Sequence, residues 1–195
     1  MKKVLLGLLV LVAVAVAFIS TRPNTYRVER SSVIAAPAEV IDPLITDFRQ
    51  WEGWSPWEKI DPAMKREFGG SPSGVGATYH WAGNNDAGEG RMTITDAEPS
   101  AKVGILLEFL KPFESTSQTT FALAPEAAGT RVTWTMDGNH NFMSKAMCIF
   151  MSMDKMIGGD FEKGLASMKL LAEGVAANAS SATGAGSTAT PAANP

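Results

Sequence analysis

Apolar and polar residues alternate along most of the chain between residues 24 and 137. The first run places Tyr26, Val28 and Arg30 on one side and Arg27 and Glu29 on the other. A period of two is typical of a half-buried β-strand. Similar runs occur near residues 65–69, 75–82, 89–97, 101–110, 114–124 and 130–137. Because Gly or Pro lies between successive runs, they predict an antiparallel sheet of about seven strands.

Two other segments have helical spacing. Residues 37–48 carry apolar side chains every three or four positions, which predicts a short helix after the first strand, with a kink or restart at Pro43. Residues 144–174 repeat this spacing, and we expect Gly158 and Gly159 to kink or break that helix. A sheet must bury one face, and this last helix is its only large apolar partner. The predicted fold class is therefore α+β, a curved antiparallel sheet wrapped on a long C-terminal helix.

The alternation is absent at the N-terminus. Lys2 and Lys3 precede an uncharged apolar run over residues 4–19. This length is close to the roughly 17–25 residues that span a bilayer and also to a long signal-peptide core. A small-x-small site lies at residues 15–17, but the apolar run continues past it, which favours an uncleaved anchor. The two lysines should stay in the cytoplasm, so the rest of the chain is predicted to be exported.

The C-terminal residues 174–195 are small or polar and carry no charge, which predicts a disordered tail. The predicted organisation is an anchor or signal peptide over residues 1–23, one domain over 24–173, and the tail. The domain carries all 20 acidic residues but only 14 of the 17 basic ones, a net charge of −6. Affinity for nucleic acid depends on neutralising phosphates, so we expect no nucleic-acid partner.

Five motifs occur in order along this domain: WSPW, GEGRMTI, LEFLKPFES, GTRVTWTMDG and MDKMIGGDFEKGLASMK. Together they resemble the helix-grip fold of the START-like superfamily, also called SRPBCC, and in particular its bacterial branch labelled polyketide cyclase/dehydrase-like. The resemblance implies a cavity between sheet and helix, where many members bind lipids, sterols or polyketide-like molecules, but it implies no particular reaction. Taken with the N-terminal apolar run and its two lysines, the bacterial branch predicts an inner-membrane protein with its domain in the periplasm, or a soluble periplasmic or secreted protein after cleavage.

Side chains alternate between the two faces of a strand, so the bulky apolar sets should face the helix. The predicted ligand-binding residues are Trp54, Trp57, Tyr79, Trp81, Met92, Ile94, Leu107, Phe109, Phe121, Trp134, Met136, Phe161 and Leu165. Among the three tryptophans of residues 51–57, we expect Trp54 to pack in the core and Trp57 to border the entrance. Arg91, Glu108 and Asp137 take the opposite face. The cavity should therefore hold no carboxylate or histidine, with the Tyr79 hydroxyl as its main polar group.

This pattern suits an apolar ligand with one hydrogen-bonding end. No catalytic residue, metal site or cofactor is predicted, because His80 and His140 have no companion at ligand spacing and nucleotide, zinc and serine-hydrolase motifs are missing. Three hypotheses remain. They are a tethered domain that binds a hydrophobic small molecule or lipid, a polyketide cyclase/dehydratase-like enzyme with Tyr79 as proton donor, and a non-catalytic interaction domain with a self-filled cavity. Met143, Met147 and Met151 would fill core gaps or form a lid.

Overall fold

A computed structural model of the chain describes residues 2–140, 142–148 and 151–185. Its strands are β1 (Thr25–Ile34), β2 (Lys65–Gly70), β3 (Ala77–Ala82), β4 (Glu89–Glu98), β5 (Lys102–Lys111), β6 (Ser115–Glu126) and β7 (Gly129–Asn139). Its α-helices are α1 (Lys2–Ser20), α2 (Ala38–Thr46), α3 (Trp51–Trp54), α4 (Phe142–Met147) and α5 (Met153–Ala185), and its 3-10 helices are η1 (Phe48–Gln50) and η2 (Pro56–Lys59).

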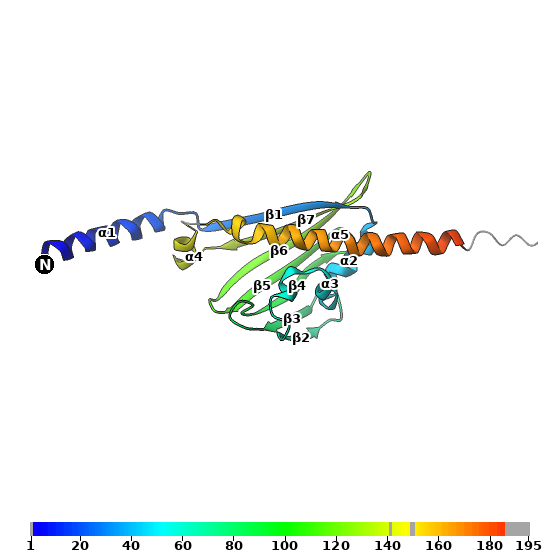
Figure 1. The fold of residues 1–195 in the computed structure, drawn as a ribbon, viewed down its shortest axis with the longest axis horizontal. Helices are drawn as coiled ribbons and strands as arrows, with labels where there is room; N and C mark the ends of the chain where they lie inside the picture. Colours follow the sequence, from blue (N-terminus) through cyan, green and yellow to red (C-terminus); the bar gives the residue numbers. More distant parts are fainter. Residues whose placement is uncertain (1, 141, 149–150, 186–195) are drawn as a thin grey trace, which may run out of the picture.

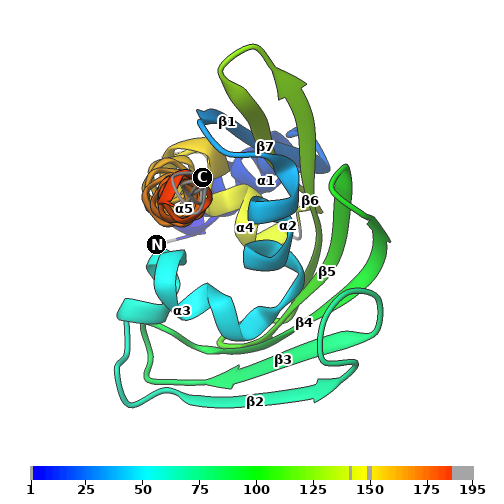
Figure 2. The ribbon, with the colours of Figure 1, turned by 90° about the vertical axis from the view of Figure 1, so that its right-hand side faces the viewer.

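The seven strands form one antiparallel sheet in the order β1-β7-β6-β5-β4-β3-β2. The sheet curves around α5, with α2 and α3 against the same concave face (Figure 2). Strands β2 to β7 begin and end within two residues of their predicted positions, and β1 continues past its predicted alternating run to Ile34. The predicted helix-grip fold of α+β class is therefore confirmed.

The core lies between the concave face of the sheet and the helices. From α5, Phe161, Leu165 and Met168 are buried against it, and α2 contributes Ile41 and Ile45. Helices α2 and α3 occupy the end of the sheet remote from α1 (Figure 1). The indole N–H groups of two tryptophans hold α3 against the end of α2. Helix ends leave their last carbonyl groups without intrahelical partners, and here those partners are tryptophan donors.

The prediction of one C-terminal helix that kinks or breaks at Gly158 and Gly159 is wrong. The chain forms two helices, α4 and α5, and α5 runs through Gly158 and Gly159 without a break. Gly158 instead lies where Arg30 crosses from β1. A Cβ at this position would lie 2.1 Å from the Arg30 guanidinium, which bonds Asp154 and Glu162. The glycine therefore makes room for a contact between helix and sheet.

The predicted tail also begins too early, because α5 continues past residue 174 to Ala185. This stretch is rich in alanine, the strongest helix former, and contains no proline before residue 191. A low-complexity composition therefore did not prevent helix formation here. The remainder of the predicted tail, residues 186–195, lies outside the described residues.

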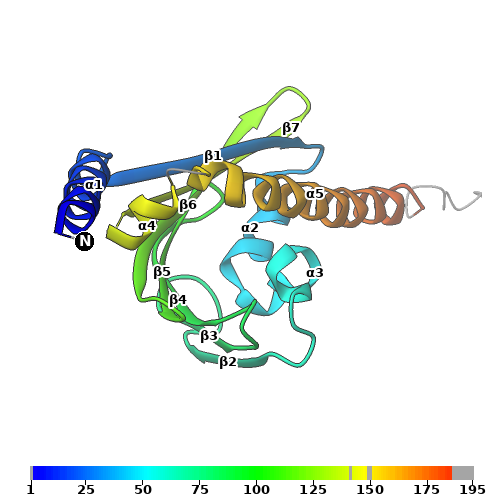
Figure 3. The ribbon, with the colours of Figure 1, turned by 60° about the vertical axis from the view of Figure 1, so that its left-hand side comes forward.

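Helix α1 projects from the domain (Figure 3). It is 19 residues long with a mean hydropathy of 2.6 and no buried surface, so it is long and apolar enough to cross a membrane. Residues 21–24 alone separate it from β1. Helix α1 therefore has the properties of an anchor or of a signal sequence.

Candidate ligand-binding cavity

A cavity of about 300 Å³ lies between the concave face of the sheet, the start of α5 and the segment from α3 to η2. Small-molecule sites in proteins commonly measure about 300–1,000 Å³, so this cavity suits a compact ligand. Most of its wall is aromatic or aliphatic.

Nine of the thirteen residues predicted from the sequence line this cavity. They are Trp57, Tyr79, Trp81, Met92, Leu107, Phe109, Trp134, Met136 and Phe161. The other four, Trp54, Ile94, Phe121 and Leu165, lie outside its lining and are at most 2% exposed in the adjoining core. Trp54 is directed toward α2 by its indole N–H, which donates to the Leu44 carbonyl over 2.8 Å. The alternation along each strand therefore predicts which face of the sheet a residue occupies, but it does not predict whether the residue lies beside the cavity or in the adjoining core.

Aromatic rings give the cavity its shape. Trp134 stacks on Phe161 with centroids 4.1 Å apart, and Trp57 meets Trp134 edge-on at 5.6 Å. Across the cavity Trp81 lies over Gly90 of the GEGRMTI motif. A Cβ on Gly90 would lie 2.4 Å from the Trp81 ring, so only glycine permits this close packing. Rigid rings that meet edge to face leave space between them that flexible side chains would fill.

The prediction of a cavity without carboxylates is wrong, because Glu58 lines it and is only 8% exposed. Tyr79 Oη donates to Glu58 Oε1 over 2.7 Å, and Arg66 Nε donates to Glu58 Oε2 over 2.6 Å. Arg66 also donates to the backbone carbonyls of Glu58 and Met64. Glu58 belongs to η2, and the alternation of strand residues carries no information about such a segment.

This arrangement raises the pKa of both partners of Glu58. Burial, with the hydrogen bond to the Glu58 carboxylate as a second cause, raises the pKa of Tyr79 well above its ordinary value. The hydrogen bond to Glu58 also raises the pKa of Arg66. Tyr79 therefore keeps its proton at physiological pH and presents an uncharged phenol to the cavity.

Several polar groups in the cavity wall lack a protein partner. The indole N–H groups of Trp51, Trp54 and Trp81 each donate to a backbone carbonyl. In contrast, Trp134 Nε1 has no hydrogen-bond partner among the described residues, but because this atom is buried it does not face the open space of the cavity. The hydroxyls of Ser55 and Thr119, both in residues at most 4% exposed, line the cavity without a side-chain hydrogen bond in the described part of the chain. Buried polar groups are nearly always paired, so the cavity offers unused hydrogen-bonding capacity.

The remaining lining residues lie outside the predicted set. They are Trp51, Ser55, Glu58, Ile60, Met64, Asp86, Ala87, Thr119 and Ile157. Most belong to helices or loops. Thr119 is the exception, since it shares the inner face of β6 with Phe121, and its position could have been found by the same parity.

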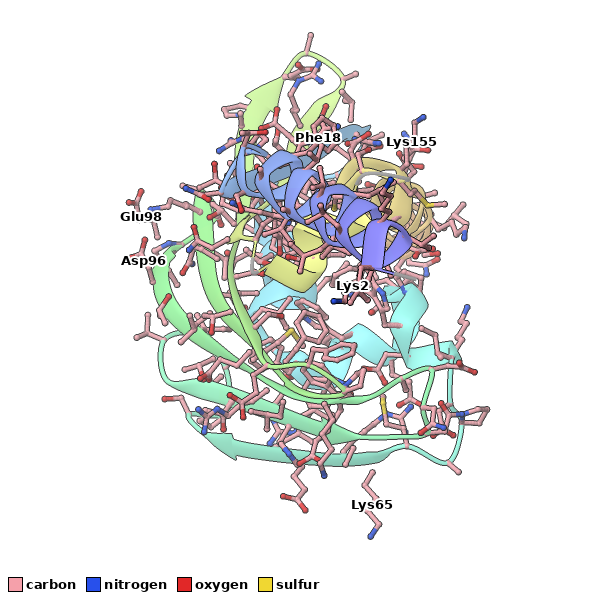
Figure 4. All side chains as sticks on the ribbon, turned by 90° about the vertical axis from the view of Figure 1, so that its left-hand side faces the viewer. Lys2, Phe18, Lys65, Asp96, Glu98 and Lys155 are labelled. Atoms are coloured by element: carbon pink, nitrogen blue, oxygen red, sulfur yellow. The ribbon has the colours of Figure 1, made fainter. Side chains whose placement is uncertain are left out.

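The most accessible lining residues mark the mouth of the cavity. Ile60 is 43% exposed, Asp86 is exposed, and Ala87 and Ile157 are half-buried. Ile60, Asp86 and Ala87 lie beside the start of β2 and the turn from β3 to β4, and Ile157 lies in the first turns of α5. By the antiparallel register, this is the same end of the sheet at which β1 begins after α1. Figure 4 looks onto this end from the side of α1, with Lys65 at the start of β2 and Lys155 near the start of α5.

Other candidate residues lie away from the cavity. His80 and His140 do not line it, and neither does Met151, which is 51% exposed. The side chains of Met143 and Met147 lie outside the described part of the structure, so the predicted lid stays a prediction. A wider open hollow on the outer face is lined by Arg27, Gln118 and Asp137 among others. Arg27 and Asp137 already form an ion pair there.

No set of three His, Cys, Asp or Glu side chains within the described residues is placed to hold a metal ion. The polar groups of the cavity are instead a phenol, a carboxylate bound to a guanidinium, two hydroxyls and, at the mouth, the Asp86 carboxylate. Such groups can orient an organic molecule by hydrogen bonds.

An antiparallel sheet that grips a C-terminal helix around an internal cavity defines a START-like, SRPBCC-type domain. The chain belongs to the family described as "Polyketide cyclase / dehydrase and lipid transport", whose model matches residues 25–173. No curated protein sequence matches the chain. The match begins at the first residue of β1, ends within α5 and does not include α1.

Solved structures share this fold at low sequence identity. Protein CV1439 from Chromobacterium violaceum is 17% identical, with a TM-score of 0.53 over 78% of this chain and 99% of its own. A Staphylococcus aureus protein of unknown function, SA2116, is 12% identical, with a TM-score of 0.56 over 77% of this chain and 95% of its own. The di-domain ARO/CYC StfQ from the steffimycin biosynthetic pathway is 10% identical, with a TM-score of 0.56 over 81% of this chain and 52% of its own. At these identities the likeness establishes the fold alone.

Proposed function

We propose that the domain binds a small hydrophobic molecule or lipid-like compound in the cavity between sheet and α5. The observation that carries this proposal is the cavity itself, an aromatic space of about 300 Å³ with a hydrogen-bonded polar end at Tyr79 and Glu58. A mostly apolar wall with a few placed polar groups is typical of small-molecule sites. The family description, which includes lipid transport, agrees with this function.

The hypothesis of a self-filled interaction domain receives less support. Its core tryptophans and methionines would have to occupy the space between sheet and helix, but the rings of Trp57, Trp81 and Trp134 line a cavity instead. A domain that serves only as a scaffold gains nothing from unpaired polar groups in its interior, because each one costs stability.

An enzyme of the polyketide cyclase/dehydratase type is the second candidate, and Glu58 is the observation that favours it. General acid or base catalysis needs a titratable group within reach of the substrate. Both Glu58 oxygens, however, already accept hydrogen bonds from Tyr79 and Arg66. The raised pKa of Tyr79 also makes it a poor proton donor. The pair is therefore better suited to recognition than to proton transfer.

We further propose that α1 is retained as a single membrane span with the domain on the periplasmic side of a bacterial inner membrane. The exposed apolar surface of α1 and its two N-terminal lysines support this orientation. The alternative is a soluble periplasmic or secreted protein released by cleavage after α1. Mass spectrometry of the mature N-terminus, together with membrane fractionation, distinguishes the two.

Ligand binding is tested on full-length protein purified in mild detergent. We expect native mass spectrometry and solvent extraction to recover a hydrophobic compound. Ala87→Trp, which adds a large side chain to the cavity wall, should reduce the recovered amount at least about tenfold. Ala124→Trp on the exposed face of β6 is the matched control and should retain the ligand. Equal recovery from both variants, or none from the wild type, would contradict the proposal.

A further inference from the structure

The Tyr79–Glu58 pair gives the cavity a polar group of defined orientation, and the ligand preference inferred from it rests on the proposed function. Glu58 and Tyr79 line the cavity, whereas Arg66 is absent from its lining and approaches Glu58 from the other side. A ligand at this end therefore meets carboxylate and phenol oxygens before it meets the positive charge. These oxygens accept hydrogen bonds, and Tyr79 has already committed its only proton to Glu58.

The donors of Arg66 are also engaged. Its guanidinium bonds Glu58 Oε2, the Glu58 carbonyl and the Met64 carbonyl. A second carboxylate brought to this end would lie near the charge of Glu58 without a free cationic partner. Like charges inside a protein are poorly screened, so such a ligand would be repelled. An uncharged hydroxyl group, in contrast, can donate to Tyr79 Oη or to Glu58.

The rest of the cavity wall can serve the remaining oxygen atoms of a ligand. The Ser55 and Thr119 hydroxyls line the cavity and can donate or accept. An oxygen atom of the ligand can bond these hydroxyls, which an unsubstituted hydrocarbon would leave without a partner.

We propose that the cavity selects an uncharged, compact, hydroxyl-bearing apolar molecule and rejects the carboxylate of the same skeleton. A hydroxyl of the ligand donates to the Tyr79–Glu58 pair, and a further oxygen bonds the Ser55 or Thr119 hydroxyl. The cavity volume of about 300 Å³ suits a fused ring system of two rings. Free fatty acids and other anionic amphiphiles are excluded by the charge of Glu58.

The test uses three probes that share one skeleton: naphthalene, 2-naphthol and 2-naphthoate. Each is titrated calorimetrically into full-length protein in lipid nanodiscs, with empty nanodiscs as the blank for partitioning into lipid. We expect 2-naphthol to bind about tenfold more tightly than naphthalene and at least about a hundredfold more tightly than 2-naphthoate. If 2-naphthoate binds as tightly as 2-naphthol, the selectivity is overturned and the binding function stands. If none of the three binds, the binding function itself fails for this cavity.

Two variants assign the selectivity to named groups. Glu58→Gln removes the charge, so the gap between 2-naphthol and 2-naphthoate should shrink to within about tenfold. Glu39→Gln on the exposed surface of α2 is the matched control and should leave the gap unchanged. Tyr79→Phe keeps the Glu58–Arg66 pair and removes the phenol oxygen. Tyr79→Phe should weaken the binding of 2-naphthol about fivefold and leave the affinity for naphthalene unchanged. This variant keeps the proposal testable if Glu58→Gln fails to fold. Unchanged selectivity in folded Glu58→Gln and unchanged 2-naphthol affinity in Tyr79→Phe would each contradict it.

Discussion

The concave face of the sheet has two halves that meet the same helix in different ways. At the end of the sheet remote from α1, aliphatic side chains such as Ile34, Ile94 and Val132 pack in the core and are at most 1% exposed. Toward the end at which β1 begins, aromatic rings and the Glu58 segment surround open space. One half of the domain is a close-packed core, and the other is a cavity.

The difference lies in the kind of side chain and in what fixes it. Aliphatic side chains in the packed half adjust to one another and leave no gaps, as protein interiors generally do. In the cavity half, Trp81 is fixed by a hydrogen bond to the Ala87 carbonyl and Tyr79 by its bond to Glu58. Side chains that are tied at their polar ends cannot move inward to fill space. A hydrogen-bonded aromatic wall therefore keeps a cavity open within a domain that is otherwise well packed.

The largest expected effect is a difference in stability between alanine variants of two tryptophans that lie three positions apart. Trp54→Ala should lower the free energy of unfolding by about 3–5 kcal/mol, because it removes a ring that is 1% exposed and hydrogen-bonded to α2. Trp57→Ala should cost only about 1–2 kcal/mol but weaken ligand binding at least about tenfold. Urea unfolding and naphthol titration measure the two quantities. Equal losses of stability in both variants would contradict the assignment of Trp54 to the packed core and Trp57 to the cavity wall.

A smaller effect is expected from Arg66, which is 23% exposed and pairs with the buried Glu58 carboxylate. Arg66→Ala should destabilise the protein by about 2 kcal/mol, because it leaves a buried charge with one neutral donor. Arg91→Ala, which breaks an ion pair with Glu108 on the outer face, should cost about 0–1 kcal/mol. Thermal unfolding of the two variants makes the comparison. A larger loss in Arg91→Ala would mean that the polar end contributes nothing to stability.

The smallest effect is a pH dependence. The pKa of Tyr79 is raised in the folded protein, so the folded state holds its proton where the unfolded state releases it. Stability should therefore be unaffected below the unfolded-state pKa of about 10 and should fall as pH rises above it, by about 1 kcal/mol between pH 9 and pH 11. Tyr79→Phe should remove this part of the alkaline slope. The same slope in wild type and variant, measured by urea unfolding across this range, would assign it to other groups.

The sequence predicted what depends on periodicity. Alternation located all seven strands and placed Trp134 and Met136 on the inner face, because a side chain on a strand has only two directions to take. It missed Glu58, whose orientation is set by a short 3-10 helix after Pro56 and by a contact with Arg66 on the next strand. It misjudged Gly158, whose role depends on Arg30 of β1. Both errors concern contacts between residues distant in sequence or in irregular segments, about which local patterns carry no information.

The short connection between α1 and β1 has a consequence for how a ligand would arrive. Residues 21–24 extend to about 14 Å at most. With α1 in a bilayer, the mouth of the cavity stays on the membrane-proximal side of the domain. A sparingly water-soluble compound is stored almost entirely in the lipid phase, so its concentration near the mouth follows its partition coefficient and not its solubility in water. The tether would then shorten the path from lipid to cavity and speed loading and release, whereas the equilibrium occupancy would equal that of a free-floating copy of the same domain.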